Sequence, residues 1–329
     1  MANENGVLIF AETTDGALAP ISAELLALAR RLGGALGQPA CAALIGSGVS
    51  GLAQEVIACG ADKVFVAEDA QLSQYMADAY VSAMEQVCKQ ANPALLLLGQ
   101  TDAGRDLAPR LAFRLGSTVA MDCVELEVQD GKVIMTRPCY GGAARAVHTS
   151  KTLPQVATVR PKSNEPLAKD SSRSGEVVTV SVSLDPSAVR TKILEKKKAE
   201  ATGIRLEDAE AVVCGGRGIG GPEGFAVLEQ LAGALGGAVG ATRAACDLGW
   251  RPVSEQIGLT GKVVSPTLYI AVALSGASQH MAGCTGAKNI IAVNKDPEAN
   301  IFKFARFGIV GDYKQVMPAL LEATKKLKS

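Results

Sequence analysis

Short apolar runs alternate with amphipathic segments along the first third of this 329-residue chain. The runs occupy residues 6–12, 40–46, 63–69 and 94–100, and each is followed by a segment with apolar residues at helical spacing. Apolar runs that are bounded by Gly or Asp and followed by period-3.6 segments are typical of parallel strands joined by crossover helices. The pattern predicts an α/β fold, with a mainly parallel sheet flanked by helices.

A change of pattern follows from residue 118 to residue 184, where strand-and-turn signals replace the alternation. Residues 124–137, VELEVQDGKVIMTR, read as a hairpin that turns at Asp130-Gly131, because Asp-Gly suits the tight turns of hairpins. We therefore expect a β-rich portion here.

The alternation resumes after a charged stretch at residues 188–210, which includes lysines 196–198 and is typical of a solvated linker. From residue 210, five further apolar runs and two amphipathic segments lead to the end of the chain. The length suits two hydrophobic cores. We predict an N-terminal α/β domain over 1–201 and a C-terminal, doubly wound α/β domain over 202–329.

Charge and cysteine content narrow the function classes. Lysine and arginine (33) balance aspartate and glutamate (33), so no global field recruits nucleic acid or an anionic membrane. The eight cysteines form no C-x-x-C pair and only two histidines are present, which disfavours a zinc or iron–sulfur site. No apolar run reaches the roughly 18 residues that suggest a membrane span, and no signal peptide is evident. We expect a cytoplasmic protein with reduced thiols, no metal and no membrane span.

One glycine motif suggests a nicotinamide cofactor. Gly46-x-Gly48-x-x-Gly51 follows a predicted strand and precedes a predicted helix, as in dinucleotide-binding turns. It follows the second strand, however, whereas the fingerprint belongs to the first strand–helix unit. A tight turn that uses glycine for positive φ is the stronger interpretation. A nicotinamide-dependent dehydrogenase that uses this loop remains the alternative function.

Polar and glycine-rich loops follow the predicted strands of the second half. Since parallel strands end at one sheet edge, these loops should converge on one crevice. The loops contain Gly215 to Gly218 with Arg217, Thr242-Arg243, Ser275 to His280, Asn294 and Asp312. Glycines allow close backbone approach, arginines supply cationic donors, and a helix predicted to start at Ser275-Gly276 would direct N–H groups at an anion. These features predict a nucleotide with a pyrophosphate, and Asn294 and Asp312 could hold ribose hydroxyls.

His280, one of the two histidines, would lie in the first turns of that helix and face the crevice. The alternative is an isolated histidine with its hydrogen bonds satisfied at the surface. Arg217 and Arg243, taken singly, could equally form surface ion pairs. A regulatory nucleotide-binding module without a redox role is a further possible function, beside a redox protein and the nicotinamide-dependent dehydrogenase.

Several motifs, in order and spacing, resemble the alpha (large) subunits of electron-transfer flavoproteins. They are GGRG, GATRAACDLGW, QIGLTGK, LYIAVALSGASQHMAG, IIAVNKDPEANIF and FGIVGDYKQVMPALLE in the second half, with LLLLGQTDAGRDLAPRLA in the first. The resemblance covers nearly the whole chain. It implies a heterodimer with a beta subunit contacted by the N-terminal domain, FAD bound by the C-terminal domain, and electron exchange with acyl-CoA dehydrogenase-type flavoproteins and other redox partners. It implies an electron-carrier subunit rather than a self-contained enzyme.

The resemblance also implies individual roles at matching positions. Arg217 and Arg243 would lie near the flavin ring, Thr260 near flavin N5 and His280 near the pyrimidine edge. Asn294 and Asp312 would serve the adenosine side. The full implied FAD-binding set is Arg217, Thr242, Arg243, Ile257, Gly258, Leu259, Thr260, Ser275, Gly276, Ala277, Ser278, Gln279, His280, Asn294 and Asp312. The family usually has Gln in place of Leu259 and a branched apolar residue in place of Ser278. These two departures from the family pattern concern the residues that would tune the flavin potential.

Overall fold

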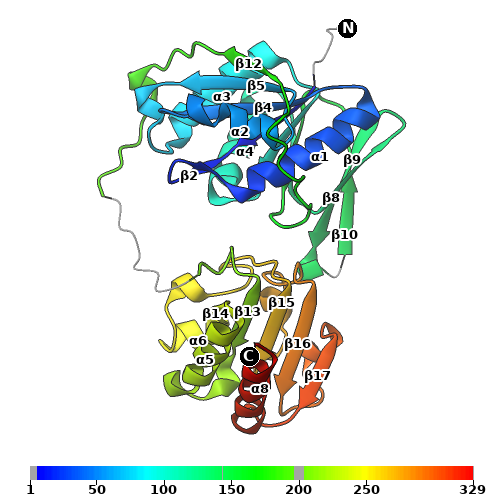
Figure 1. Cartoon of the computed structure of the whole chain (residues 1–329), viewed down its shortest axis with the longest axis vertical. Helices are drawn as coiled ribbons and strands as arrows, with labels where there is room; N and C mark the ends of the chain where they lie inside the picture. The colour runs from blue at the N-terminus through cyan, green and yellow to red at the C-terminus, as the bar shows by residue number, and fades with distance from the viewer. Residues whose placement is uncertain (1–5, 143, 196–203, 329) are drawn as a thin grey trace. The chain divides into compact units, whose positions relative to one another are not determined.

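The computed structural model describes residues 6–142, 144–195 and 204–328, which form two compact units (Figure 1). One unit consists of Met1–Pro138 and Arg145–Lys196, and the other of Cys139–Ala144 and Lys197–Ser329. The predicted domain boundary at residue 201 and lysines 196–198 lie outside the described residues. Each unit contains a parallel sheet flanked by helices, so the predicted α/β fold class is confirmed.

The N-terminal unit is organised around a seven-stranded sheet with the order β12-β5-β4-β1-β6-β11-β7 and parallel pairing throughout. Its strands are β1 (Val7–Ala11), β4 (Ala40–Gly46), β5 (Lys63–Glu68), β6 (Leu95–Gly99), β7 (Val119–Cys123), β11 (Gln155–Val159) and β12 (Glu176–Thr179). Strands β1, β4, β6 and β11 are buried along their whole length, as expected for a sheet covered on both faces.

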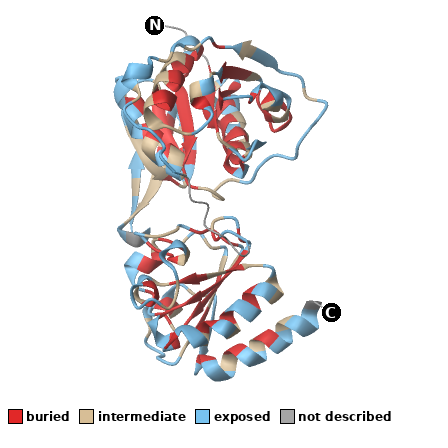
Figure 2. Cartoon of the chain, turned by 90° about the vertical axis from the view of Figure 1, so that its left-hand side faces the viewer, coloured by how far each residue is buried: buried red, intermediate tan, exposed pale blue. Residues whose placement is uncertain are grey.

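Helices cover both faces of this sheet, because successive side chains of a strand point to opposite sides. Val7 and Ile9 pack with α1 (Pro20–Leu36) and α2 (Ala53–Ala58). Leu8 and Phe10 pack with α3 (Ala77–Ala91) and α4 (Asp102–Arg114). Figure 2 shows the resulting buried layer between helices whose outer faces are exposed.

The predicted hairpin is present as β8 (Glu125–Gln129) and β9 (Lys132–Cys139), joined by Asp130 and Gly131. Both turn residues have positive φ, 50° and 73°, as a type I′ turn requires. Strand β10 (Ala144–His148) completes a three-stranded sheet. The β-rich portion also supplies β7, β11 and β12 to the parallel sheet, which the strand-and-turn pattern did not predict.

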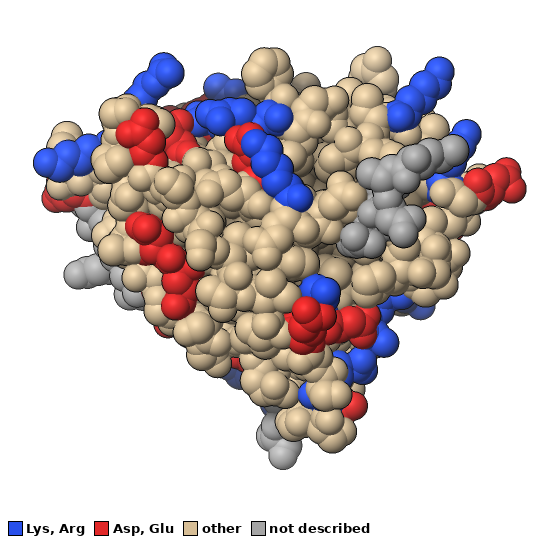
Figure 3. Space-filling view, turned by 90° about the horizontal axis from the view of Figure 1, so that it is seen from above, with Lys and Arg blue, Asp and Glu red and all other residues tan. Residues whose placement is uncertain are grey.

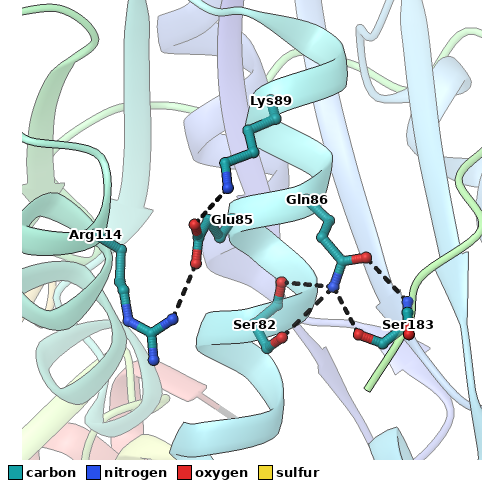
Figure 4. Close-up of polar contacts among 6 residues, drawn as sticks. All are labelled: Ser82, Glu85, Gln86, Lys89, Arg114 and Ser183. Carbon is teal, nitrogen blue, oxygen red and sulfur yellow. Dashed lines mark hydrogen bonds and ion pairs between the residues drawn. The ribbon is translucent and has the colours of Figure 1, made fainter. Parts of the chain in front are cut away.

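A segment after β12 is fastened to α3 by side chains (Figure 4). Gln86 accepts a hydrogen bond from the Ser183 N–H through Oε1 (2.9 Å) and donates through Nε2 to the Ser183 carbonyl (3.0 Å). Beside it, Glu85 pairs with Lys89 (2.6 Å) and Arg114 (3.1 Å), which links α3 to α4. The remaining short elements are β2 (Thr13–Thr14), β3 (Ala17–Leu18), η1 (Ser50–Leu52), η2 (Ala70–Leu72) and η4 (Pro186–Ala188).

The C-terminal unit has a five-stranded parallel sheet with the order β14-β13-β15-β16-β17. The strands are β13 (Ala211–Gly215), β14 (Ala238–Ala241), β15 (Leu268–Val272), β16 (Asn289–Asn294) and β17 (Phe307–Val310). The helices are α5 (Phe225–Leu235), α6 (Arg243–Asp247), α7 (Ser278–Met281) and α8 (Tyr313–Lys328), with η3 (Tyr140–Gly142), η5 (Arg217–Ile219), η6 (Pro222–Gly224), η7 (Val253–Glu255) and η8 (Asn300–Lys303). Every strand predicted in this half is present.

The strand order of this sheet fixes where a ligand can bind. From β13 the chain crosses to β14 on one side and then returns to β15 on the other side. The loops after β13 and β15 therefore leave the sheet edge in opposite directions and open a crevice between them. Helices α5 and α8 pack on one face of the sheet, whereas α7 packs on the other.

On the face shown in Figure 3, acidic and basic side chains lie interspersed among uncharged residues. Within the described part of the chain, none of the helices combines the length and the apolar composition that crossing a bilayer requires.

Candidate functional site

A pocket of about 960 Å³ lies at the carboxyl ends of β13, β14, β15 and β16, where the strand order opens the crevice. This volume is in the upper part of the range typical of ligand sites. Of the predicted cofactor-binding residues, the pocket is lined by Arg217, Thr242, Arg243, Ile257, Gly258, Leu259, Thr260, Ser275, Gly276, Ala277, Gln279, His280 and Asn294. The structure thus gathers these residues from four separate loops.

Ser278 and Asp312 do not line the pocket. The Ser278 hydroxyl donates to Gln279 Oε1 (3.3 Å) and is exposed. Asp312 occupies the position before α8, where its Oδ1 accepts from the Lys314 N–H (2.9 Å). A carboxylate there caps the helix, which is sufficient reason for an aspartate at that position.

The glycines after β13 bring two loops together. A Cβ on Gly216 would lie 2.5 Å from the Ala273 carbonyl oxygen, and one on Gly218 would lie 2.8 Å from the same atom. The Gly218 N–H donates to that carbonyl at 3.0 Å. These glycines therefore allow close approach between the β13 and β15 loops, whereas the sequence interpretation assigned them to the ligand.

The loop after β15 corrects one prediction. The helix expected to start at Ser275-Gly276 begins only at Ser278 and contains four residues. Ala273 and Gly276 have positive φ, 51° and 75°, so the chain turns sharply before the helix. A Cβ on Gly276 would lie 2.4 Å from the Ile301 nitrogen, whose N–H donates to the Ser275 carbonyl. The loop is thus shaped by its contact with residues 300–301, and this contact is not visible in local sequence.

His280 is buried, with only 7% of its surface exposed, yet it borders the pocket. Its Nδ1 lies 3.1 Å from the Ile257 carbonyl oxygen, and its Nε2 lies 2.9 Å from the Tyr269 hydroxyl. Burial lowers the pKa of the imidazole from 6.5 to about 4, although the Ile257 carbonyl opposes the shift. The ring is therefore neutral at pH 7, and the alternative of a surface histidine is wrong.

Two arginines face the pocket from different loops. Arg217 is exposed at the start of η5, and Arg243 is exposed at the start of α6. Arg243 Nε lies 3.3 Å from Asp247 Oδ2, an exposed ion pair of modest strength. Arg243 therefore does form a surface ion pair, and both members of that pair line the pocket.

The segment of residues 256–262 forms a compact turn beside β14. Gln256 bridges to Ala241, and Ile257 bridges to Lys262. The Leu259 N–H donates to the Gln279 carbonyl (2.7 Å), while the residue as a whole is 68% exposed. Thr260 Oγ1 accepts from Gln256 Nε2 (3.0 Å). The turn places residues 257–260 along the pocket wall.

Thr242 carries an orphaned polar atom. Its Oγ1 is buried and, within the described residues, makes no hydrogen bond, although the residue lines the pocket. A buried hydroxyl without a partner is costly unless another molecule satisfies it. This atom fits a polar ligand group in the pocket.

Sequence reasoning missed further lining residues. They are Ala244, Asp247, Gln256, Ala273, Leu274, Glu298, Ala299 and Asn300, whereas Gly218 and Asp296, which also line the pocket, belong to the strand-end loops expected from the sequence. Ala273 and Leu274 come directly after β15, and Gln256 is the first residue of the motif QIGLTGK. Residues 298–300 lie beyond the strand-end loop itself. The N–H groups of residues 298 and 299 donate to Asp296, and the N–H of residue 301 donates to the β15 loop, so these bonds bring the segment to the pocket.

The Gly46 loop has a structural explanation. A Cβ on Gly46 would lie 2.5 Å from the Val49 side chain, and Gly48 has φ of 69°. The Ser50 N–H, at the turn before α2, donates to Glu68 Oε1 at 2.7 Å. The protein's own carboxylate thus occupies a donor that a phosphate would need.

Comparison with family models gives two matches. Residues 7–185 match the model described as "Electron transfer flavoprotein domain", and residues 205–285 match that described as "Electron transfer flavoprotein FAD-binding domain". The second match includes most of the pocket, from the β13 loop to α7.

Curated relatives match along the full length. The chain is 43% identical over 330 residues to the electron transfer flavoprotein subunit alpha of Thermoanaerobacterium thermosaccharolyticum, covering 100% of both chains. It is 45% identical over 323 residues to that of Bacillus subtilis, covering 98% of each. It is 41% identical to protein FixB of Clostridium saccharobutylicum, covering 100% of this chain and 99% of the relative. The chain therefore belongs to the electron transfer flavoprotein alpha subunit family.

Proposed function

We propose that this chain is the alpha subunit of a heterodimeric electron-transfer flavoprotein and that it binds FAD in the pocket of its C-terminal unit. The observation that carries the proposal is the coincidence of this pocket, at the strand-order crevice, with the region that matches the FAD-binding family model. When bound, FAD supplies the ability to accept and release electrons. The nicotinamide alternative is not favoured, because Glu68 already engages the Gly46 loop.

The residues present fit such a group. The buried Thr242 hydroxyl has no protein partner, and the turn of residues 257–260 borders the same pocket. In this proposal Arg217, Arg243 and Thr260 surround the flavin ring and Asn294 lies toward the adenosine side. Ser278 and Asp312, which lie outside the pocket, are not included.

The two arginines would act electrostatically. A guanidinium near a ring that gains negative charge stabilises the charged form, and it does so more strongly in a partly enclosed site than in open water. Asp247 weakens the effect of Arg243 through their ion pair. The protein would thus set the potential of the cofactor, while no side chain needs to transfer a proton to a substrate.

The proposed partners are a beta subunit and an acyl-CoA dehydrogenase-type flavoprotein. The beta subunit is supported by family membership. The dehydrogenase follows from the resemblance alone, and a cytoplasmic location likewise stays a prediction of the sequence. In this proposal the N-terminal unit, residues 1–201 by sequence, contacts the beta subunit.

The test is production of the full chain together with its beta subunit, followed by absorbance spectroscopy. We expect a yellow heterodimer that an acyl-CoA dehydrogenase reduces in the presence of its substrate. A colourless heterodimer that binds NADH would refute the proposal in favour of a nicotinamide enzyme. A colourless heterodimer that binds neither would point to a role without redox chemistry.

A further inference from the structure

Tyr269 and His280 form a buried pair behind the pocket wall. Tyr269 lies in β15, and strand alternation directs its side chain to the sheet face that packs against α7, with Cys214 and Ala271. Its side chain is fully buried, and its hydroxyl lies 2.9 Å from His280 Nε2. Tyr269 itself does not line the pocket, whereas His280 does.

The second contact of His280 decides its tautomer. Its Nδ1 lies 3.1 Å from the Ile257 carbonyl oxygen, and a carbonyl oxygen can only accept a hydrogen bond. Nδ1 therefore carries the proton. In a neutral ring Nε2 is then the unprotonated nitrogen, so the Tyr269 hydroxyl must be the donor to it.

The surroundings of Tyr269 agree with this direction. Cys284, in the same buried cluster, directs its thiol to the His280 backbone carbonyl (3.7 Å). Imidazole nitrogen is a much stronger acceptor than a thiol, so the single phenolic proton goes to His280. Burial raises the pKa of Tyr269 and lowers that of His280, so both groups are neutral at pH 7.

We propose that Tyr269 is a positioning residue for His280: its hydroxyl holds Nε2, and the Ile257 carbonyl holds Nδ1–H, so that His280 meets the cofactor as a neutral ring with no free N–H. This inference rests on the proposed function, because it concerns the ring that would face the flavin. It departs from a simple hydrogen bond between His280 and the pyrimidine edge, since both ring nitrogens are already engaged within the protein.

The pair also determines where a proton could enter. Nδ1 is already protonated, so an added proton must bind Nε2, and the Tyr269 hydroxyl would then turn from donor to acceptor. Tyr269 is the titratable group in contact with the ring, and the Cys284 thiol contacts the His280 backbone carbonyl. The charged groups that line the pocket beside the ring are Arg217, Arg243, Asp247, Asp296 and Glu298. A hydroxyl that can reverse its role keeps Nε2 satisfied in either state.

The test is ¹⁵N NMR of the full chain labelled at its histidine rings. Only His148 and His280 contribute signals, and exposed His148 in β10 serves as an internal reference. At pH 7 we expect one His280 nitrogen with a bonded proton, Nδ1, and one without, Nε2. A proton bonded to Nε2 in the unmodified chain would overturn the proposal without any variant.

Two variants assign the Nε2 contact. Tyr269→Phe removes the donor, so the His280 Nε2 signal should move further toward the frequency of a free, unprotonated nitrogen. Tyr313→Phe is the matched control, because it deletes another buried tyrosine hydroxyl of the same unit, one that donates to the Ile219 carbonyl at 2.7 Å. An Nε2 signal that moves equally in both variants, or in neither, would refute a specific role for Tyr269.

Flavin absorbance of the same chain, prepared as the heterodimer, separates this inference from the proposed function. Bound flavin together with a Nε2-protonated His280 would refute the inference alone. The expected tautomer in a heterodimer that takes up no flavin would refute the proposed function, and with it the role of the pair toward a cofactor. Bound flavin with the expected tautomer supports both.

Discussion

Asn294 holds the loop that contains Leu274. Its Nδ2, at the end of β16, donates to the Leu274 carbonyl at 2.8 Å, and its Oδ1 accepts from the Asp296 N–H at 3.0 Å. The side chain therefore joins the loops after β15 and β16, which form adjacent walls of the pocket. An amide suits both contacts, because its NH₂ group donates while its carbonyl oxygen accepts.

Asn294→Asp should destabilise the protein by about 1–2 kcal/mol, since the Leu274 carbonyl loses its donor and faces a carboxylate instead. Asn289→Asp, at the opposite end of the same strand, is the control. Asn289 also donates to a backbone carbonyl, that of Thr267, but its Oδ1 accepts from Arg306, which a carboxylate would still satisfy. Denaturant unfolding of both variants measures the difference. Equal losses would show that the Asn294 bridge has no special role.

Much of the fold could be predicted from the sequence because its strands are short, fully buried and separated by helices. The run ACAALIG became β4 without change of bounds, and the Asp130-Gly131 turn formed as expected. Strands β7 and β11 were harder, because their place in the parallel sheet depends on pairing between distant segments. Val156 pairs with both Leu96 and Val119, and neither contact leaves a local signal.

The site, like the fold, could be predicted only in part. The rule that loops converge at the carboxyl ends of parallel strands brought Arg217, Arg243 and His280 to one pocket. The rule fails for Asp312, because the loop after β17 is one position further from the crevice and its carboxylate caps α8. The delayed start of α7 was also unpredictable, since it results from the contact of Gly276 with Ile301.

Glu12 should make stability depend on pH. Its Oε1 accepts from Thr101 Oγ1 at 2.9 Å, and burial raises the pKa of its carboxyl to about 7, against an ordinary value of 4.5. A raised carboxyl pKa means that the folded state binds the proton more tightly. The stabilisation is complete below about pH 4.5 and is lost as pH rises through 7.

Glu12→Gln should therefore raise the free energy of unfolding by about 3 kcal/mol at pH 8 and change it little at pH 4. The amide oxygen can still accept from Thr101. Exposed Glu127→Gln is the control and should leave the pH profile unaltered. Urea unfolding at both pH values measures the effect, and a gain of equal size at pH 4 and pH 8 would contradict the assignment.

Arg243 and Asp247 should move the flavin potential in opposite directions. Because they form an exposed ion pair at the pocket, Arg243→Ala removes positive charge and should lower the potential, whereas Asp247→Ala should raise it. An interaction of about 0.5–1 kcal/mol corresponds to roughly 20–40 mV for one electron. Arg306→Ala, before β17 at the opposite edge of the sheet, should have no effect. Potentiometric titration decides, and shifts of the same sign would place the pair away from the ring.

Gly276 is required for two reasons, its backbone conformation and the lack of space for a side chain, and substitutions can separate them. Its φ is 75°, which disfavours a side chain, and a Cβ there would lie 2.4 Å from the Ile301 nitrogen. Gly236, which ends α5, has a similar φ of 69° but open space around it. Gly236→Ala therefore reports the backbone cost alone.

We expect Gly236→Ala to cost about 1 kcal/mol, the penalty of a left-handed alanine partly offset by the reduced freedom of the unfolded chain. Gly276→Ala should cost a further 1–3 kcal/mol or so, because backbone atoms must shift to admit the methyl group. That shift displaces the β15 loop from residues 300–301, so the flavin content should fall as well, whereas Gly236→Ala should retain it. Thermal unfolding and flavin absorbance measure the two effects. If both variants lost the same stability and kept their flavin, the contact between Gly276 and Ile301 would not shape the pocket.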